Sequence, residues 1–350
     1  MVVLPAGDDL DATMRYFVEE LGFRLDSIGP ADAPTYARLS GHGLNLLLEK
    51  AESHVPGILR IICKEDTAPR ILTAPNGTRI EFAPADRVPV IPAPAPRASI
   101  QNCPTSDSAW TRGRAGMLYR DLVPDRAGGY LIASHIRIPE GGLVADNVHH
   151  HAISFQFIYC RRGWVRLVYE DQGEPFVLEA GDCVLQPPHI RHRVLEASAG
   201  LEVIELASPA THETWLDHGM KLPTRRLLPE RHYSGQAFVL HRAREAHWET
   251  RSGTGIEARD IGLRNATGGR VDVHVLRRVT AGPPNLETAV GRNGAFTFLF
   301  VLRGAVDIAL EDLPATTLAA DGTCVIPARS RLHFDRCAPD LELLEVQCPG

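Results

Sequence analysis

Four polar side chains near the middle of the chain have the types and spacing of a metal site. His149 and His151 flank a third histidine, His150, and Gln156 follows five residues after His151. His192 comes 41 residues after His151, on a separate strand-like run. Successive side chains of a strand point to opposite faces, so His149 and His151 would share one face and His150 the other. We therefore predict that three imidazoles and one amide, His149, His151, His192 and Gln156, converge on one metal ion.

The same residues carry a resemblance to the cupin superfamily. Its first motif is matched by His149, His151, Gln156 and Gly163, and its second motif by Gly181, Pro187 and His192. Gln156 stands where the family usually has Glu, and His189 stands where it usually has Gly in a turn. The first departure removes a negative charge from the ligand set. The resemblance implies a jelly-roll barrel, also called a double-stranded β-helix, with the metal inside.

The chain repeats itself at an offset of about 140 residues, as expected of a duplicated domain. The matched positions are Trp110 with Trp248, Arg120 and Asp121 with Arg259 and Asp260, His135 with His274, Phe155 to Tyr159 with Phe296 to Phe300, Gly181 with Gly322, and Pro187 with Pro327. Each copy is a series of short strands between Gly and Pro turns. The chain is thus similar to a bicupin, and the persistence of His135 and His274 suggests that this position serves the barrel itself.

Only the first copy keeps the metal-binding set. The second copy has Val290, Arg292, Thr297 and His333 at the four ligand positions. A single histidine with these neighbours cannot form a ligand set, so we expect the second barrel to be metal-free and to serve packing or an interface.

The residues before the barrels form a separate segment that ends in a proline-rich spacer at Ala83 to Arg97. A strand at Val2 to Leu4, a helix from about Asp8 and further strands give a βαβββ order, which resembles half of a glyoxalase-like (vicinal oxygen chelate) domain. The chain is therefore predicted to be mainly β, with a small α+β module in front of two tandem barrels. The predicted segments are 1–85 for this module, 86–100 for the linker, 101–222 for the metal-binding barrel and 223–350 for the degenerate barrel.

The composition limits which binding partners are expected for this chain. The 350 residues carry a net charge of -6 with dispersed Lys and Arg, so no basic surface for nucleic acid and no membrane anchor is expected. No leader-like or membrane-spanning run is evident, which favours the cytoplasm. The seven cysteines are scattered and suit buried, reduced thiols. The N-terminal module is interpreted as structural or as the basis of a homodimer.

The ligand set suggests an enzyme. Four protein ligands leave open positions on an ion that accepts five or six, as catalytic metals require. The set does not choose among Fe, Zn, Ni, Mn and Cu, although Fe or Zn is favoured. All four ligands are neutral, so the ion would attract a small anionic chelating substrate such as an enolate, a β-diketone, a 2-oxo acid or a catechol-like ring.

Three functions remain open from the sequence. A dioxygenase is favoured because the resemblance implies it for many three-histidine cupins, and a redox-silent ion would instead suit an isomerase or cyclase. A non-catalytic small-molecule binder is the third alternative. His189 is the candidate catalytic base, because it lies three residues before His192, whereas Tyr159 shares the outward face of its strand with Phe155 and Phe157.

Overall fold

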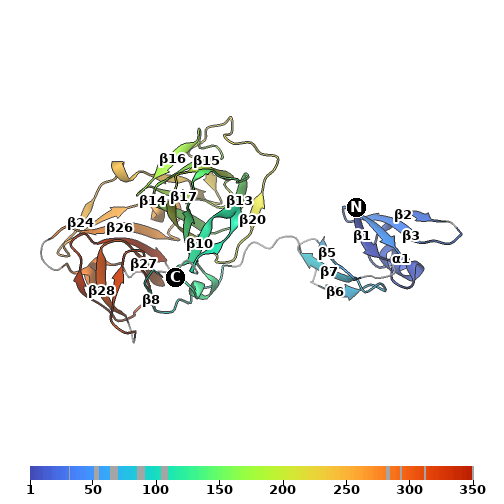
Figure 1. Ribbon diagram of the computed structural model, residues 1–350, viewed down its shortest axis with the longest axis horizontal. Coiled ribbons are helices and arrows are strands. Elements are labelled where there is room, and N and C mark those ends of the chain that lie inside the picture. The colour runs from blue at the N-terminus through green and yellow to red at the C-terminus, as the bar shows by residue number, and fades with distance from the viewer. Residues whose placement is uncertain are drawn as a thin grey trace. The chain divides into compact units, whose positions relative to one another are not determined.

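The chain divides into two compact units, Met1–Val88 and Pro89–Gly350, in the computed structural model shown in Figure 1. The structure describes all residues except 31, 51–54, 64–69, 85–90, 104–108, 281–283, 292–293, 311–312 and 349–350. Part of the predicted proline-rich spacer, residues 85–90, lies outside the described residues.

The N-terminal unit contains the predicted βαβββ order. Its elements are β1 (Val2–Pro5), α1 (Leu10–Glu19), β2 (Arg24–Gly29), β3 (Tyr36–Gly41) and β4 (Leu44–Glu49), with the strands in the order β1-β4-β3-β2. The helix begins after Asp9, whose carboxylate accepts a hydrogen bond from the backbone N–H of Ala12 at 3.0 Å. Leu10 and Phe17 are buried on one helix face and join the core of this unit.

A second, three-stranded sheet completes this unit. It consists of β5 (Ile58–Cys63), β6 (Arg70–Thr73) and β7 (Arg79–Pro84) in the order β5-β7-β6, with β5 parallel and β6 antiparallel to β7. Strand β6 was not predicted, because its four residues carry little hydrophobic alternation. Ile80 and Phe82 of β7 pack into the core shared with the first sheet.

The first barrel consists of two facing sheets. One has the strand order β23-β17-β14-β19-β11-β10-β9 and the other β16-β15-β18-β13-β20, with β12 paired to β18. The strands are β9 (Thr111–Arg112), β10 (Leu118–Asp121), β11 (Ile132–Ile138), β12 (Gly142–Leu143), β13 (His149–His151), β14 (Phe155–Arg162), β15 (Trp164–Tyr169), β16 (Phe176–Glu179), β17 (Cys183–Gln186), β18 (His192–Ala197), β19 (Leu201–Ser208), β20 (Thr214–Leu216) and β23 (Val239–His241). The short hairpin of β21 (His232–Tyr233) and β22 (Gln236–Ala237) precedes β23.

The second barrel repeats this plan. Its sheets have the orders β24-β25-β26-β32-β27-β30-β8 and β29-β28-β31. Its elements are β8 (Ser99–Gln101), β24 (Glu249–Arg251), β25 (Ile256–Asp260), α2 (Leu263–Ala266), β26 (Asp272–Arg278), α3 (Leu286–Ala289), β27 (Phe296–Arg303), β28 (Ala305–Leu310), β29 (Thr316–Ala319), β30 (Thr323–Pro327), β31 (Leu332–Cys337) and β32 (Glu342–Cys348). The prediction of a mainly β chain with two tandem barrels is confirmed.

Two strands cross the segment boundaries drawn from the sequence. Strand β8, which follows the spacer, pairs with β30 of the second barrel. Strand β23, which was assigned to the second barrel, pairs with β17 of the first. Strand β8 thus lies before the first barrel in the chain but extends a sheet of the second, and β23 lies between the two barrels and extends a sheet of the first. Each strand covers a sheet edge that would otherwise expose unpaired backbone groups.

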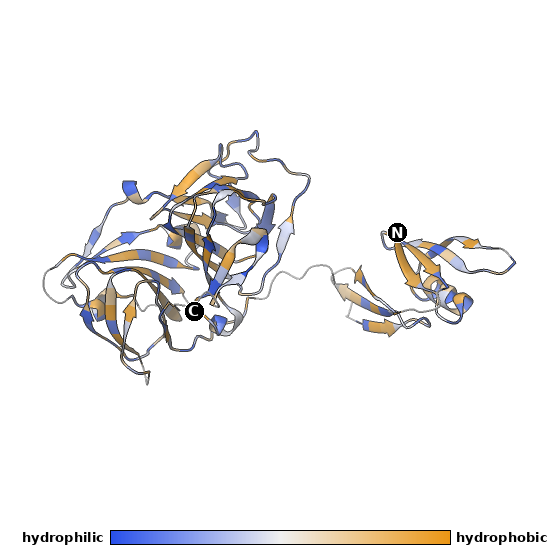
Figure 2. Ribbon diagram, viewed as in Figure 1, coloured by the Kyte–Doolittle hydropathy of each residue, from blue (hydrophilic) through white to orange (hydrophobic). Residues whose placement is uncertain are grey.

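A shared hydrophobic core joins the two barrels. Phe155 and Phe157 of β14 lie in the same buried cluster as Phe296, Phe298 and Phe300 of β27. Alternate residues of these strands face the barrel interiors instead, and hydrophobic and hydrophilic residues alternate along many strands in Figure 2. Tyr159 also belongs to this shared cluster, as its strand parity predicted.

The match between His135 and His274 is wrong by one residue. Asp121 pairs with Ser134 and the matched Asp260 pairs with His274, so Ser134 is the counterpart of His274. A shift of one residue along a strand reverses the face of the side chain. His135 accordingly points out of its barrel, whereas His274 points inward and lies 3.4 Å from the Glu345 carboxylate.

His135 is instead part of the junction between the barrels. Its ring contacts Trp110 and Phe300 at centroid distances of 5.1 and 5.9 Å, and its Nε2 lies 3.1 Å from the Glu202 carboxylate.

Of the described helices, none is long and apolar enough to cross a membrane.

Candidate metal centre

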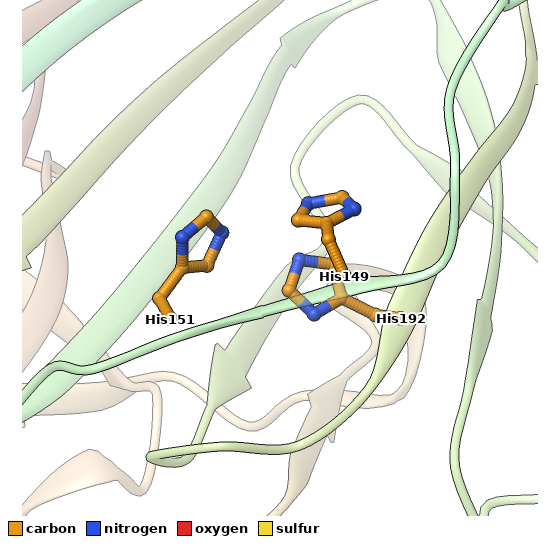
Figure 3. Close-up of side chains that lie close together, drawn as sticks. All are labelled: His149, His151 and His192. Atoms are coloured by element: carbon orange, nitrogen blue, oxygen red, sulfur yellow. The ribbon is translucent and has the colours of Figure 1, made fainter. Parts of the chain in front are cut away.

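Three of the four predicted ligands meet inside the first barrel. His149 and His151 are buried on one face of β13, and His150 is half-buried on the other. His149 pairs directly with His192 of β18. One nitrogen from each of the three rings lies within 4.8 Å of the others, and Figure 3 shows the rings gathered around a common space.

Hydrogen bonds at the outer nitrogens orient two of these rings. His149 Nδ1 lies 2.7 Å from the carbonyl oxygen of Asn147, and His192 Nδ1 lies 3.0 Å from that of Ile190. A carbonyl oxygen can only accept, so both Nδ1 atoms carry the proton and both Nε2 atoms hold a lone pair. Histidine ligands are commonly oriented in this way by a partner on the second ring nitrogen.

The third ring has a hydroxyl in the corresponding place. His151 Nδ1 lies 3.0 Å from Thr214 Oγ1 on β20, which pairs with β13. A hydrogen bond donated to this hydroxyl leaves His151 Nε2 with a lone pair as well. All three rings can therefore present the same atom type to one ion.

Burial keeps the three rings neutral. Desolvation is the largest cause in each case: it lowers the pKa of His151 to about 2, holds the pKa of His192 well below its usual value, and lowers that of His149. Arg114 lowers all three pKa values further, and neighbouring imidazoles also lower those of His151 and His192. Neutral imidazoles are the form that binds a metal, so the cluster fits a divalent transition ion.

Gln156 lies in the wall of the same cavity on β14. Its Oε1 accepts a hydrogen bond of 3.0 Å from Nε2 of Gln186, which stands opposite it on β17. The Gln186 amide also lies 3.2 Å from His192 Nε2 and accepts a hydrogen bond of 2.7 Å from the Tyr169 hydroxyl. Gln186 thus links two of the predicted ligands, and nothing in the sequence motifs marked it.

The cavity is small and mostly apolar. Its volume is about 70 Å³. Its apolar walls come from Met117, Ile136, Ile138, Ile158, Val165, Leu167, Val194, Leu201 and Val203. Such walls limit water near the three rings and limit the size of a ligand that could reach them.

Arg114 is a cationic wall residue that the sequence analysis missed. Its guanidinium forms an ion pair with the buried carboxylate of Asp146 through Nη1, and its Nη2 lies 3.1 Å from His149 Nε2. Asp146 also accepts a hydrogen bond of 2.9 Å from the backbone N–H of Val194. Arg114 precedes His149 by 35 residues and reaches it from another part of the barrel, so no local spacing could reveal the contact.

Glu205 is a second wall residue that the sequence analysis missed. It lies on β19 opposite Ile158, lines the cavity and hydrogen-bonds to the side chain of Gln156. Burial raises the pKa of its carboxyl group. A carboxyl beside Gln156 stands close to where the family motif has Glu, but it comes from a different strand.

His189 is not placed with this cluster. The residue is exposed, and its backbone has a positive φ of 63°. Its ring lies against His150 on the outer face of β13, with the two Nδ1 atoms 3.4 Å apart. His189 is absent from the residues lining the cavity, so the geometry does not support it as the catalytic base.

The corresponding region of the second barrel is built differently. Helix α3 takes the place of the histidine strand, and its Leu286 and Ala289 pack with Val290 into the hydrophobic interior. Thr297 donates a hydrogen bond of 2.6 Å to the carbonyl of Gly291. His333 is exposed and lies 2.6 Å from a Glu287 carboxylate oxygen, and Arg292 falls outside the described residues.

Comparisons with known proteins agree with this architecture. Residues 134–205 match the sequence model of the cupin domain. The fold is similar to that of Lactobacillus farciminis oxalate decarboxylase in a formate complex, with a TM-score of 0.52 and 13% identity over 73% of this chain and 89% of that chain. It is also similar to a protein from Pseudomonas aeruginosa described as glyoxylate-induced, with a TM-score of 0.50 and 12% identity over 74% and 94% of the chains. No curated protein matches the chain in sequence. At these identities the similarity establishes the fold, tandem cupin barrels.

Proposed function

We propose that this protein is a metal-dependent enzyme that acts on a small anionic, oxygen-chelating substrate inside the first cupin barrel. One observation carries the proposal: three buried, neutral imidazoles gather around one space, and hydrogen bonds at their Nδ1 atoms leave the lone pair of each ring on Nε2. Burying three such groups without a ligand would cost several kcal/mol, and coordination offsets that cost. Gln156, in the same wall, is the candidate fourth ligand.

The cavity supports the substrate class. Arg114 offers guanidinium N–H groups to a carboxylate or enolate oxygen, and Arg is suited to bidentate contacts with such anions. The small volume restricts the reacting part of the substrate to a few atoms. The apolar walls would strengthen the attraction between Arg114 and an anion because they exclude water.

A dioxygenase is the favoured reaction class. When bound, a divalent transition ion supplies Lewis-acid chemistry to a chelating substrate and, if it is Fe(II), reactivity toward dioxygen. The residues of the chain would then hold the anion through Arg114 and orient the ligands through Thr214 and the backbone carbonyls of Asn147 and Ile190. The surrounding aliphatic side chains would keep water out. This division of roles needs no protein base.

Glu205 favours an isomerase or cyclase as the second candidate. Such a reaction moves a proton between atoms of the substrate, and an acid–base side chain within reach is what it requires. Glu205 lines the cavity and has that chemistry, whereas His189, the base expected from the sequence, is not among the described residues that line it.

Metal content and oxygen dependence test these functions together. Protein purified without added metal would be analysed for Fe, Zn, Mn, Ni and Cu, and then supplied with β-diketones, catechols and 2-oxo acids in air and under argon. Oxygen uptake that matches substrate loss supports the dioxygenase. Turnover under argon points to the isomerase or cyclase, and tight metal binding without any turnover would make the protein a binder.

The N-terminal unit, Met1–Val88, folds around a hydrophobic core of its own. We infer that this unit is a glyoxalase-like half-domain with a structural role, such as the formation of a homodimer. Light scattering on the full chain and on a chain starting at Pro89 would test this, because equal oligomeric states would exclude a role in dimerisation.

A further inference from the structure

We propose that Arg114 is a latch on the candidate metal centre. It holds the coordinating nitrogen of His149 until a metal displaces it, and it then binds the carboxylate of the substrate. This inference rests on the proposed function, because it requires a metal and an anion to meet in this cavity. It adds an order of binding, with the metal before the anion.

The position of Arg114 connects the cavity with the outside. The residue begins the short 3-10 helix η2 (Arg114–Gly116), which directly precedes β10. Its side chain lines the cavity and is 38% exposed, so it borders both the cavity and solvent. Asp146, with a side chain only 1% exposed, anchors one end of the guanidinium.

The contact with His149 excludes coordination by the same atom. His149 Nδ1 carries the proton that is donated to the Asn147 carbonyl, so Nε2 holds the only lone pair of the ring that lies in its plane. Arg114 Nη2 donates to this Nε2 across 3.1 Å. One lone pair cannot accept this hydrogen bond and coordinate a cation, and the positive charges of a metal and a guanidinium also repel one another.

The displaced guanidinium remains in the cavity wall. Asp146 still holds Nη1, while the N–H groups that had faced His149 lose their partner. Among the described residues that line the cavity, Arg114 is the only arginine or lysine. A carboxylate that chelates the metal could accept hydrogen bonds from this guanidinium, so metal binding prepares the anion site.

Substitution of Arg114 should move two affinities in opposite directions. Titration calorimetry on metal-free protein would compare wild type with Arg114→Met, first with Mn²⁺ alone and then with pyruvate on the metal-loaded protein. Loss of a charge-assisted hydrogen bond to His149 should tighten Mn²⁺ binding by about tenfold or more. Pyruvate binding should weaken by about tenfold or more, since the bond from guanidinium to carboxylate is lost.

Arg112 provides the matched control. It lies two residues away, is exposed, and donates to the Gly116 carbonyl on the same turn without lining the cavity. Arg112→Met removes the same charge and should change neither affinity. Equal tightening of Mn²⁺ binding in both variants would overturn the latch, because it would show a general charge effect.

A second set of variants separates the latch from its alternatives. Removal of Arg114 also frees Asp146, whose carboxylate lies 3.6 Å from His149 Nδ1 and could strengthen this ligand. If the gain in Mn²⁺ affinity disappears in Arg114→Met combined with Asp146→Asn, the latch is wrong. Arg114→Lys serves as a second variant in case Arg114→Met does not fold. It keeps a cation for Asp146, but its single ammonium group replaces the two-pronged guanidinium, so this variant should also bind Mn²⁺ more tightly than wild type.

The latch and the proposed function fail in different ways. If Mn²⁺ binds wild type and the His151→Ala variant equally, the metal centre itself is wrong. If Mn²⁺ binding depends on His151 but is unchanged in Arg114→Met, the metal centre stands and only the latch is refuted.

Discussion

His149 and His192 face each other across two antiparallel strands, with ring centroids 4.2 Å apart. Two cationic rings at this distance in a buried place would repel strongly, so the two rings are not protonated together, and burial lowers the pKa of each. Neutral imidazoles with lone pairs directed at a common point are ready to share a cation. This pair supplies two nitrogens of the candidate centre, and His151 adds the third from the same strand as His149.

Removal of one ring should abolish tight metal binding. His151→Ala and His192→Ala should each lower metal affinity by more than about 100-fold, because loss of an outer partner of a ligand alone costs about 10- to 100-fold. His333→Ala, the exposed counterpart in the second barrel, should leave metal content unchanged. Metal analysis after dialysis measures both, and equal loss from the two barrels would show that the centre has been assigned to the wrong one.

The hydroxyl behind His151 should tune metal affinity without touching the ion. Thr214→Val keeps the shape of the side chain and removes the hydrogen bond to His151 Nδ1. We expect metal affinity to fall by about 10- to 100-fold while the fold is kept. Thr214→Ser retains a hydroxyl and should restore most of the affinity in the same calorimetric titration. A Val variant that binds as tightly as wild type would mean that this hydrogen bond does not orient the ring.

A change of charge at Gln156 should affect the anion more than the metal. Gln156→Glu introduces the residue that the cupin motif usually has, so metal binding should persist. The added negative charge should weaken binding of an anionic substrate by about tenfold, as like charges in a partly dry site oppose each other. Binding of pyruvate to the metal-loaded variant is the measurement. A tighter anion complex would contradict the charge argument.

Acid should destabilise the metal-free protein through the buried histidines. The folded protein lowers the pKa of His151 to about 2, against 6.5 for the free side chain. Below pH 6.5, His151 is therefore protonated in the unfolded chain but remains neutral in the folded protein. This contribution to stability is therefore fully present above about pH 6.5 and is lost progressively as the pH falls toward the folded pKa. For each ring that stays neutral in the folded protein, the free energy of unfolding should be about 2 kcal/mol lower at pH 5 than above pH 6.5.

Urea unfolding at pH 7.5 and pH 5 measures this loss. The pKa values of His149 and His192 are lowered in the same direction, so their losses add to that of His151. His151→Ala in the metal-free state should lose less stability between the two pH values than wild type does. An equal loss would show that the ring of His151 is already protonated in the folded protein.

The sequence alone predicted the architecture, and it predicted a cluster of three histidines that the structure brings together. Alternation along β13 separates His149 and His151 from His150, and the period of two makes this independent of the rest of the fold. The Gly and Pro turns and the repeat near 140 residues predict two barrels, because each copy carries the same series of short strands. These features are local or repeated, so they can be recognised without knowledge of how the strands pair.

Tertiary structure alone decided the rest of the site. Arg114 reaches His149 only through the path of the segment before β10, and Glu205 meets Gln156 only through the register of β19 against β14. The same dependence on register explains why His274 was matched to His135 and not to Ser134. A shift of one residue is not visible when similar residues are aligned by type, but it reverses the face of a strand. Contacts between residues that are far apart in the chain are set by strand pairing and loop path, and neither is written in the spacing of the residues themselves.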